Sequence, residues 1–172
     1  MTVLGIDPGT HRFGWGVVSR TGTRLRHVAH GVIRAPEGAP LAERLVVIEA
    51  ELLRALGAHA ISCASVEAIF FAKDAQAAAK LGHARGVALL VCARHGLEVA
   101  EYPPARVKRT VAGHGRADKA QVAQMMRVIL GLTETPPSDA ADALALAVTH
   151  LQNSAFRAAV KSPVNPSRSR AV

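Results

Sequence analysis

The chain has 172 residues, which suits one domain with a buried core and leaves little room for a second. Because 49% of the residues are hydrophobic, composition excludes an intrinsically disordered chain. The formal net charge of +8 favours a polyanionic partner such as nucleic acid. The longest uninterrupted apolar stretch, Val87–Ala93, is far shorter than the ~20 residues of a membrane-spanning helix, so no membrane protein is expected.

The first part of the chain predicts three antiparallel strands. Thr2–Asp7 is a short apolar and β-branched run that stops at a Pro-Gly turn. Phe13–Arg20 and Leu25–Arg34 are joined by a tight Thr-Gly-Thr connection, which predicts an antiparallel meander. Gly14 and Gly16 alternate on one face of the second strand, so we expect another segment to pack close to the backbone there.

Helices and strands alternate along the rest of the chain. The predicted elements are a helix from Leu41 to Gly57, a strand at Ala60–Glu67, a helix from Asp74 to His95, a strand at Leu97–Tyr102, a short helix past Pro104, a helix at Asp118–Leu130 and a last helix at Asp139–Leu151. Strands four and five follow helical crossovers, so each is expected to run parallel to a neighbour. We predict an α/β fold with a five-stranded mixed sheet, strands one to three antiparallel and strands four and five parallel, flanked by helices.

The end of the chain has a different composition from the rest. From Gln152 onward, Ser, Pro, Asn and basic residues replace the apolar periodicity. The four charged residues of this segment are all basic and supply half of the net charge: Arg157, Lys161, Arg168 and Arg170. We therefore expect a folded domain at 1–152 and a basic, disordered tail at 153–172 that can contact phosphates without sequence preference.

Two cysteines, Cys63 and Cys92, each lie within an apolar stretch. This placement is typical of small buried side chains in a reducing compartment. The first residues contain no basic segment followed by an apolar run, so no secretory signal is expected. We expect a cytoplasmic protein.

Four of the thirteen acidic residues occupy informative positions. Asp7 and Glu67 each end an apolar strand, and ligand clefts of α/β sheets form at such carboxyl ends. Asp139 and Asp142 lie about one turn apart on one face of the last helix. A structural alternative stays open, because acids also suit helix starts, turns and solvated strand ends.

If these carboxylates share one pocket, their mutual repulsion raises their pKa values unless cations lie between them. Hard divalent ions with oxygen ligands, Mg²⁺ or Mn²⁺, suit such a group. No cluster of Cys and His favours zinc. Spacing alone leaves the choice between a metal site and ordinary surface acids open.

Six motifs in chain order resemble one known family. They are Gly5-Ile6-Asp7-Pro8-Gly9-Thr10, Gly14-Trp15-Gly16-Val17, Val66-Glu67, Phe70-Phe71-Ala72-Lys73, Lys80-Leu81-Gly82-His83-Ala84-Arg85-Gly86 and Asp139-Ala140-Ala141-Asp142-Ala143-Leu144-Ala145. Together they resemble the RuvC family of crossover junction endodeoxyribonucleases from about Val3 to His150. The combination is specific, although Gly-Ile-Asp-Pro-Gly alone is not. The resemblance implies a ribonuclease H-like fold and a homodimer that resolves four-way (Holliday) junctions by paired symmetric nicks in recombination and DNA repair.

The resemblance also implies a catalytic and metal-binding tetrad. Carried over by motif, it consists of Asp7, Glu67, Asp139 and Asp142, and all four family positions hold a carboxylate here. The cofactor expected from the family is Mg²⁺, with Mn²⁺ as a plausible substitute and two ions in each site. The expected reaction is two-metal-ion hydrolysis of a phosphodiester bond.

Two adjacent aromatic residues follow the second tetrad residue. Phe70 and Phe71 point to opposite faces if the backbone is extended, so one or both could belong to the core. The resemblance favours Phe70 as an exposed ring that stacks on unpaired bases at the junction centre. Which of the two rings is exposed stays open.

Basic residues supply further candidates for DNA contact. Lys108 and Lys119 match family positions near the active site, and Lys119 could also stabilise the transition state. Arg116 and Lys119 flank a predicted helix start, where free N–H groups favour phosphate. Lys73 and Arg85 are weaker candidates. A solvated charged surface is the alternative for all of them.

Small residues dominate the helix predicted from Asp74 to His95, which permits close approach of another helix. Burial of this helix on its own domain would explain them equally well. The resemblance assigns the helix to the dimer interface, and two-fold symmetry then presents two active sites to opposed strands. The family also implies contact with the branch-migration proteins RuvA and RuvB.

Two other functions compete with this interpretation. Asp7-Pro8-Gly9-Thr10 followed by Gly14 resembles the phosphate loop of actin-like and Hsp70-like ATPases, but this chain is too short for their second lobe. A basic junction-binding protein without catalysis would account for the net charge. Acids next to a phosphate are unfavourable without metal ions, however, so the clustered carboxylates favour an enzyme.

Overall fold

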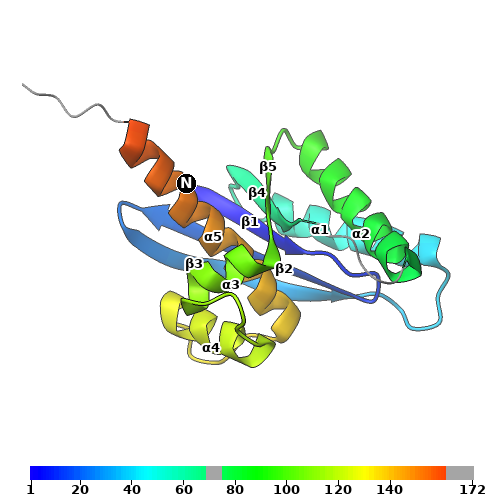
Figure 1. Ribbon diagram of the computed structural model, residues 1–172. Helices are drawn as coiled ribbons and strands as arrows, with labels where there is room; N and C mark the ends of the chain where they lie inside the picture. Colours follow the sequence, from blue (N-terminus) through cyan, green and yellow to red (C-terminus); the bar gives the residue numbers. More distant parts are fainter. Residues whose placement is uncertain (69–74, 162–172) are drawn as a thin grey trace, which may run out of the picture.

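The computed structural model describes residues 1–68 and 75–161. Within this part, five strands form one mixed sheet in the order β3-β2-β1-β4-β5 (Figure 1). The strands are β1 (Thr2–Asp7), β2 (Arg12–Thr21), β3 (Arg24–Arg34), β4 (Cys63–Glu67) and β5 (Val99–Tyr102). β1 to β3 are antiparallel, whereas β4 runs parallel to both β1 and β5. The predicted fold class and strand directions are confirmed.

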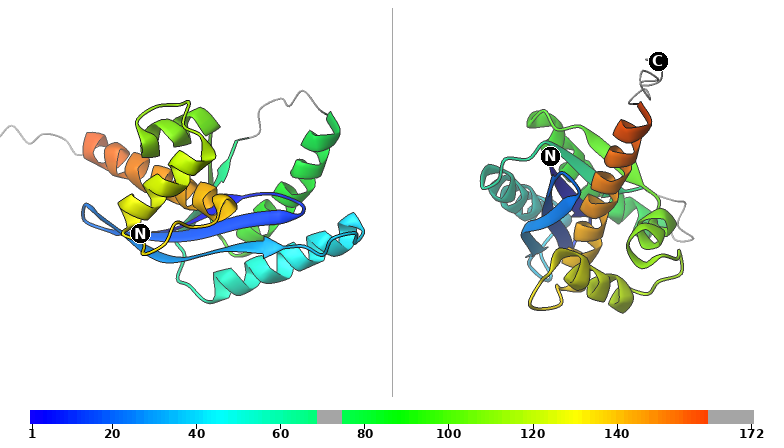
Figure 2. Two further views of the ribbon diagram at one scale, coloured as in Figure 1. Left: turned by 90° about the horizontal axis from the view of Figure 1, so that it is seen from below. Right: turned by 90° about the vertical axis from the view of Figure 1, so that its left-hand side faces the viewer.

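Helices cover both faces of the sheet (Figure 2). They are α1 (Leu41–Gly57), α2 (Ala75–Arg94), α3 (Pro104–Ala112), α4 (Lys119–Leu130) and α5 (Ser138–Lys161). α1 and α2 share one core with the sheet, and α3, α4 and α5 share the other. Among the described helices, none combines the length and apolarity that crossing a membrane requires.

The alternation of side chains along the strands decides which residues face α5. In β1, Val3 belongs to the core beneath α5 and Ile6 to the core beneath α1 and α2. The same alternation turns Asp7 toward the α5 face. In β4, Cys63 belongs to the α5 core, so Glu67, four residues later, faces α5 as well. Two strand-end carboxylates are thereby directed to one side of the sheet.

α5 lies against the sheet with its backbone close to the strands. A Cβ at Gly5 would overlap the carbonyl oxygen of Ala143, and a Cβ at Gly14 would overlap that of Asp139. A Cβ at Gly16 would lie 2.7 Å from a leucine side-chain carbon of α5. The close approach predicted at Gly14 and Gly16 is confirmed, and the segment that approaches is α5.

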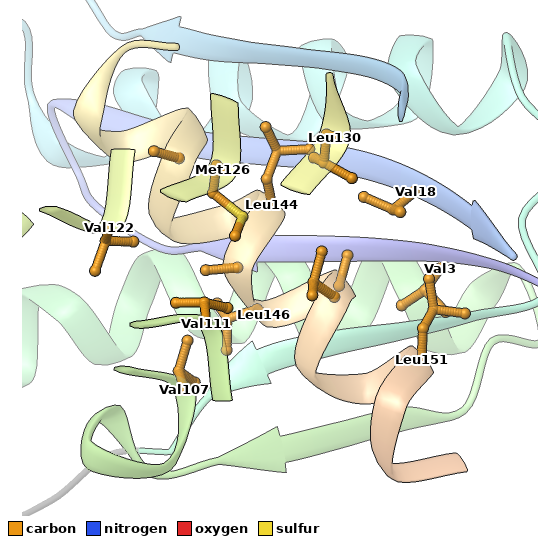
Figure 3. Packing of buried hydrophobic residues seen from close by; sticks show 14 of the residues in the cluster. Val3, Val18, Val107, Val111, Val122, Met126, Leu130, Leu144, Leu146 and Leu151 are labelled. Atoms are coloured by element: carbon orange, nitrogen blue, oxygen red, sulfur yellow. The ribbon is translucent and has the colours of Figure 1, made fainter. Parts of the chain in front are cut away.

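Aliphatic side chains from the helices and the sheet fill the core beneath α5 (Figure 3). Leu144 and Leu151 of α5, Met126 of α4 and Val3 of β1 are all fully buried. Residues 143–149 of α5 are buried around the whole circumference of the helix, which is typical of a central helix. The acids of α5 are accordingly confined to its start, at the edge of the core.

Some element boundaries differ from the prediction. α5 continues from the predicted end at Leu151 to Lys161, so residues 153–161 of the predicted tail are helical. The segment is rich in alanine and holds no proline before position 163, and these properties favour continuation of the helix. The predicted cap of α2 at Asp74 lies outside the described residues.

Candidate active site

Three carboxylates from separate parts of the chain line one cavity. Asp7 ends β1, Glu67 ends the neighbouring parallel strand β4, and Asp142 reaches the same place from the start of α5. The cavity has a volume of about 200 Å³, and Lys108 and Lys119 also contribute to its wall. The rest of the lining is apolar, from Pro104, Val107, Val122 and Leu146.

Burial and mutual repulsion control the ionisation of these acids. Desolvation, reinforced by the carboxylates of Asp142 and Glu67, raises the pKa of Asp7 to about 7. Burial also raises the pKa of Glu67 and of Asp142, and in both cases the ammonium group of Lys119 partly opposes the shift. At neutral pH these carboxylates are therefore all ionised only when an additional positive charge binds beside them.

The carboxylates at the start of α5 each face a basic side chain. Asp139 accepts a hydrogen bond from Arg12 Nε at 2.6 Å, and its side chain is 17% exposed. The Nζ atom of Lys119 lies 3.5 Å from Oδ2 of Asp142. Asp139 is not part of the cavity lining, although it contributes to the field that raises the pKa of Asp7.

The donor chemistry and the side-chain geometry give different answers about a metal ion. Within the described residues, no three His, Cys, Asp or Glu side chains are grouped tightly enough to hold one. Two of the acids have basic partners instead, Asp139 with Arg12 and Asp142 with Lys119. The donors themselves are all carboxylate oxygens, which suit Mg²⁺ and Mn²⁺, and their repulsion is of the kind a divalent cation relieves. The donor atoms of these residues are therefore of the chemical type that such an ion binds.

The model of the family described as crossover junction endodeoxyribonuclease RuvC matches residues 3–150. The chain belongs to the RuvC family. RuvC of Sorangium cellulosum is 56% identical over 171 residues, which cover 99% of this chain and 96% of the relative. RuvC of Rhodopseudomonas palustris (strain TIE-1) is 53% identical over 148 residues, 86% of this chain and 85% of that protein.

Solved structures show the same relationship. Thermus thermophilus RuvC in complex with a Holliday junction substrate superposes with a TM-score of 0.84 at 40% identity, covering 91% of this chain and 96% of that one. A fowlpox virus resolvase, at 14% identity and a TM-score of 0.53, shares the fold alone; 88% of this chain and 99% of that one are covered. As a RuvC family member with the ribonuclease H-like fold, the chain is a crossover junction endodeoxyribonuclease, a nuclease that acts on DNA.

The structure of this RuvC family member brings only some of the predicted DNA contacts to the site. Lys108 and Lys119 line the cavity of the carboxylates, whereas Arg116 is exposed and does not contribute to its lining. Phe70 and Lys73 lie outside the described residues.

The start of α4 differs from what the sequence led us to expect. The carboxylate of Asp118 accepts the backbone N–H of Gln121 at 2.8 Å, and the Gln121 side chain accepts the N–H of Asp118 at 2.9 Å. This capping box occupies two of the four N–H groups at this helix start, those of Asp118 and Gln121. Lys119, the first residue of α4, also lines the cavity.

The structure places Arg85, one of the weaker candidates for DNA contact, in a buried position. Only 7% of the residue is exposed. Its Nη1 donates to the backbone carbonyl of Glu67 at 2.9 Å, and its Nη2 lies 2.6 Å from Oε1 of Glu101. The guanidinium is thus bound to two acceptors of the protein itself, the Glu67 carbonyl and the half-exposed carboxylate of Glu101. Sequence reasoning missed the inward contact, because the small residues around Arg85 indicate close packing of the helix but not against which partner.

Proposed function

We propose that this chain is a homodimeric, structure-selective endonuclease that resolves four-way (Holliday) DNA junctions by paired symmetric nicks. The observation that carries the proposal is the convergence of Asp7, Glu67 and Asp142 on one cavity that two lysines also line. Kinship with a RuvC that was solved with a Holliday junction supports the choice of substrate. The reaction we infer is two-metal-ion hydrolysis, in the service of recombination and DNA repair.

We infer that Asp7, Glu67, Asp139 and Asp142 hold Mg²⁺, or Mn²⁺ in its place. When bound, the ions supply Lewis-acid activation of water and neutralise charge on the leaving oxygen. Asp7 and Glu67 face α5 from adjacent strand ends, so the sheet holds them side by side. Asp139 pairs with Arg12 in this structure, and it would have to release that partner to act as a ligand.

The lysines of the cavity have a separate task in this proposal. A DNA phosphate that approaches three carboxylates is repelled, and the ammonium groups of Lys108 and Lys119 offset that repulsion. Lys119 also adds positive charge beside the phosphate at which charge develops in the transition state. The described lining of the cavity contains no Ser, Cys or His, which favours water over an enzyme side chain as the nucleophile.

Paired nicks require two active sites, so we infer a two-fold dimer. α2 is the element the family resemblance favours for the interface, and its Leu90 is 49% exposed. An apolar side chain on a helix with an exposed glycine one turn earlier, at position 86, suits contact with a second copy. We also propose that the protein contacts RuvA and RuvB and that it is located in the cytoplasm.

A cleavage assay on a synthetic four-way junction tests this function. With Mg²⁺ or Mn²⁺ we expect nicks at symmetric positions in two opposed strands, and DNA ligase should reseal the products. With EDTA, cleavage should stop while a gel-shift assay still detects the complex. A chain that binds the junction but leaves it uncut with either ion is an architectural binder, and the proposal is then wrong.

A further inference from the structure

We propose that Arg85 is a positioning residue for Glu67, and that it fixes the end of β4 from α2. The proposal rests on the proposed function, in which Glu67 is a metal ligand. Arg85 is absent from the lining of the cavity, so it acts through the backbone of Glu67 and not on the substrate.

The Glu67 carbonyl needs a donor that the sheet does not supply. β1 and β4 are parallel, with Gly5 opposite Ser65 and Ile6 opposite Val66. When this register is continued, the β1 residue that would donate to the Glu67 carbonyl is Pro8, and proline has no N–H. Arg85 Nη1 provides the missing hydrogen bond, at 2.9 Å. The guanidinium thus takes the place of a ladder donor at the point where the strand delivers its carboxylate.

The packing of α2 holds Arg85 in this position. Its neighbours Ala84 and Ala88 are 0% and 1% exposed, so small side chains let the helix lie close to the sheet. The second nitrogen of the guanidinium forms its ion pair with Glu101 of β5, which is the strand next to β4. One planar group therefore connects α2, β4 and β5. A lysine has a single nitrogen and cannot reproduce this two-acceptor geometry.

The consequence for catalysis follows from the covalent distance between the two groups. The carbonyl carbon of Glu67 is bonded to the Cα atom that carries its side chain, so the hydrogen bond constrains where the carboxylate begins. Displacements of about 1 Å in catalytic groups can cost about 100-fold in rate. We expect loss of Arg85 to weaken metal binding and the chemical step while junction binding is retained.

Three variants of the full chain test the proposal: Arg85→Lys, Arg85→Met and the matched control Arg94→Met. Arg94 lies on the same helix but is exposed, and it forms a looser ion pair with Glu49 at 3.5 Å. The readouts are the single-turnover cleavage rate, the Mg²⁺ concentration at half-maximal rate, Mn²⁺ affinity by calorimetry and junction affinity in EDTA. For both Arg85 variants we expect a rate lowered by about 10-fold or more, a raised Mg²⁺ requirement and weaker Mn²⁺ binding. Junction affinity should stay within about two-fold, and Arg94→Met should match the wild type.

The outcomes distinguish a positioning role of Arg85 from a purely structural role and from a contact with DNA. If Arg85→Lys folds with a lowered melting temperature but keeps the wild-type rate and Mn²⁺ affinity, Arg85 is only structural and the proposal is overturned. If junction affinity in EDTA falls in parallel with the rate, Arg85 contacts DNA, which also overturns it. If Arg85→Met does not fold, Arg85→Lys decides, because it retains the buried positive charge. Failure of the wild type to cut any junction contradicts the proposed function instead, whereas the Mn²⁺ measurement still decides the role of Arg85.

Discussion

The two halves of the carboxylate site are held in different ways. Asp7 and Glu67 sit at the ends of adjacent sheet strands, and burial raises the pKa of both. Asp139 and Asp142 belong to the start of α5, and each has a basic side chain within 4 Å of its carboxylate. The register of the strands fixes the positions of the two strand-end carboxylates. The two carboxylates at the helix start can instead exchange their basic partners for other cations. Burial raises the pKa of Asp142 as well, so the two halves differ in their partners: among the described residues, only the helix-start acids form ion pairs. We therefore expect a divalent cation to act most strongly on the strand-end acids.

The largest effect is expected from Asp7→Asn in the strand-end half. This substitution removes the carboxylate at the end of the central strand, and junction cleavage with Mg²⁺ should fall by about 1,000-fold or more. Junction binding should be retained, because an acid that repels phosphate is lost. A gel-shift assay and a cleavage assay on the same samples measure both quantities.

The matched control for that experiment is Asp118→Asn. Asp118 is an acid outside the cavity, and asparagine also serves as an N-cap, so this variant should cut like the wild type. Cleavage by Asp7→Asn within about ten-fold of the wild type would contradict the assignment of Asp7.

The next effect tests the contact between the halves, at Gly14. A Cβ there would overlap the carbonyl oxygen of Asp139, so Gly14→Ala must push the start of α5 away from the sheet. We expect cleavage to fall by about 100-fold and the free energy of unfolding to fall by about 1–3 kcal/mol. Gly57→Ala is the control, since a Cβ at Gly57 meets nothing within 4 Å. Equal behaviour of the two variants in cleavage and urea unfolding would show that the contact does not set the spacing of the acids.

The raised pKa of Asp7 predicts a pH-dependent stability difference. Below about pH 4 Asp7 is protonated in both the folded and the unfolded chain, so its ionisation does not affect stability. Between about pH 4 and about 7 the unfolded chain carries Asp7 as a carboxylate whereas the folded chain keeps it protonated, so stability falls across this window and the full loss persists above it. Without divalent ions, Asp7→Asn should therefore raise the free energy of unfolding at pH 8 by on the order of 1–4 kcal/mol.

Urea titrations at several pH values measure this difference. Mg²⁺ should narrow it, because a ligand that binds only the folded wild type stabilises it. A variant that is no more stable than the wild type at pH 8 would contradict the raised pKa of Asp7.

The smallest effect is expected in the helix-start half. If Arg12 competes with a metal ion for Asp139, Arg12→Gln should tighten Mn²⁺ binding by about two- to five-fold, since half-exposed ion pairs contribute little energy. Calorimetry with Mn²⁺ measures the change. Arg54→Gln, which removes an exposed pair with Glu51 on α1, should leave Mn²⁺ affinity unchanged. Weaker Mn²⁺ binding in Arg12→Gln would mean that Arg12 orients Asp139 and does not compete for it.

The sequence predicted what local patterns determine. The apolar run and the Pro-Gly stop placed Asp7 at a strand end, and the paired glycines of β2 indicated that some segment packs close to the backbone there. The pattern of strands and crossovers was enough for the number and the directions of the strands. These features depend on residues a few positions apart, so a linear reading can find them.

Contacts between residues far apart in the sequence could not be predicted from local patterns. Arg85 looked like one more basic residue on a helix, and its burial depends on a carbonyl eighteen positions earlier and on Glu101 of another strand. The pairing of Arg12 with Asp139 spans 127 positions. The added helical turns of α5 were missed for a different reason, because alanine continues a helix without leaving an amphipathic pattern.

The close contact of α5 with two glycines also affects how substitutions elsewhere in the core act on the carboxylate site. At Gly5 and Gly14 the helix backbone rests directly on the strand backbone, with no layer of side chains between them. The distance between the two carboxylate pairs is therefore set by main-chain contact, and main chain has the same size in every sequence. Met126 and Leu130 of α4 belong to the same core but are not part of this contact. We therefore expect their substitution to disturb the spacing of the acids less than a Cβ at Gly14. The distance between the two carboxylate pairs should thus depend little on which side chains fill the rest of the core.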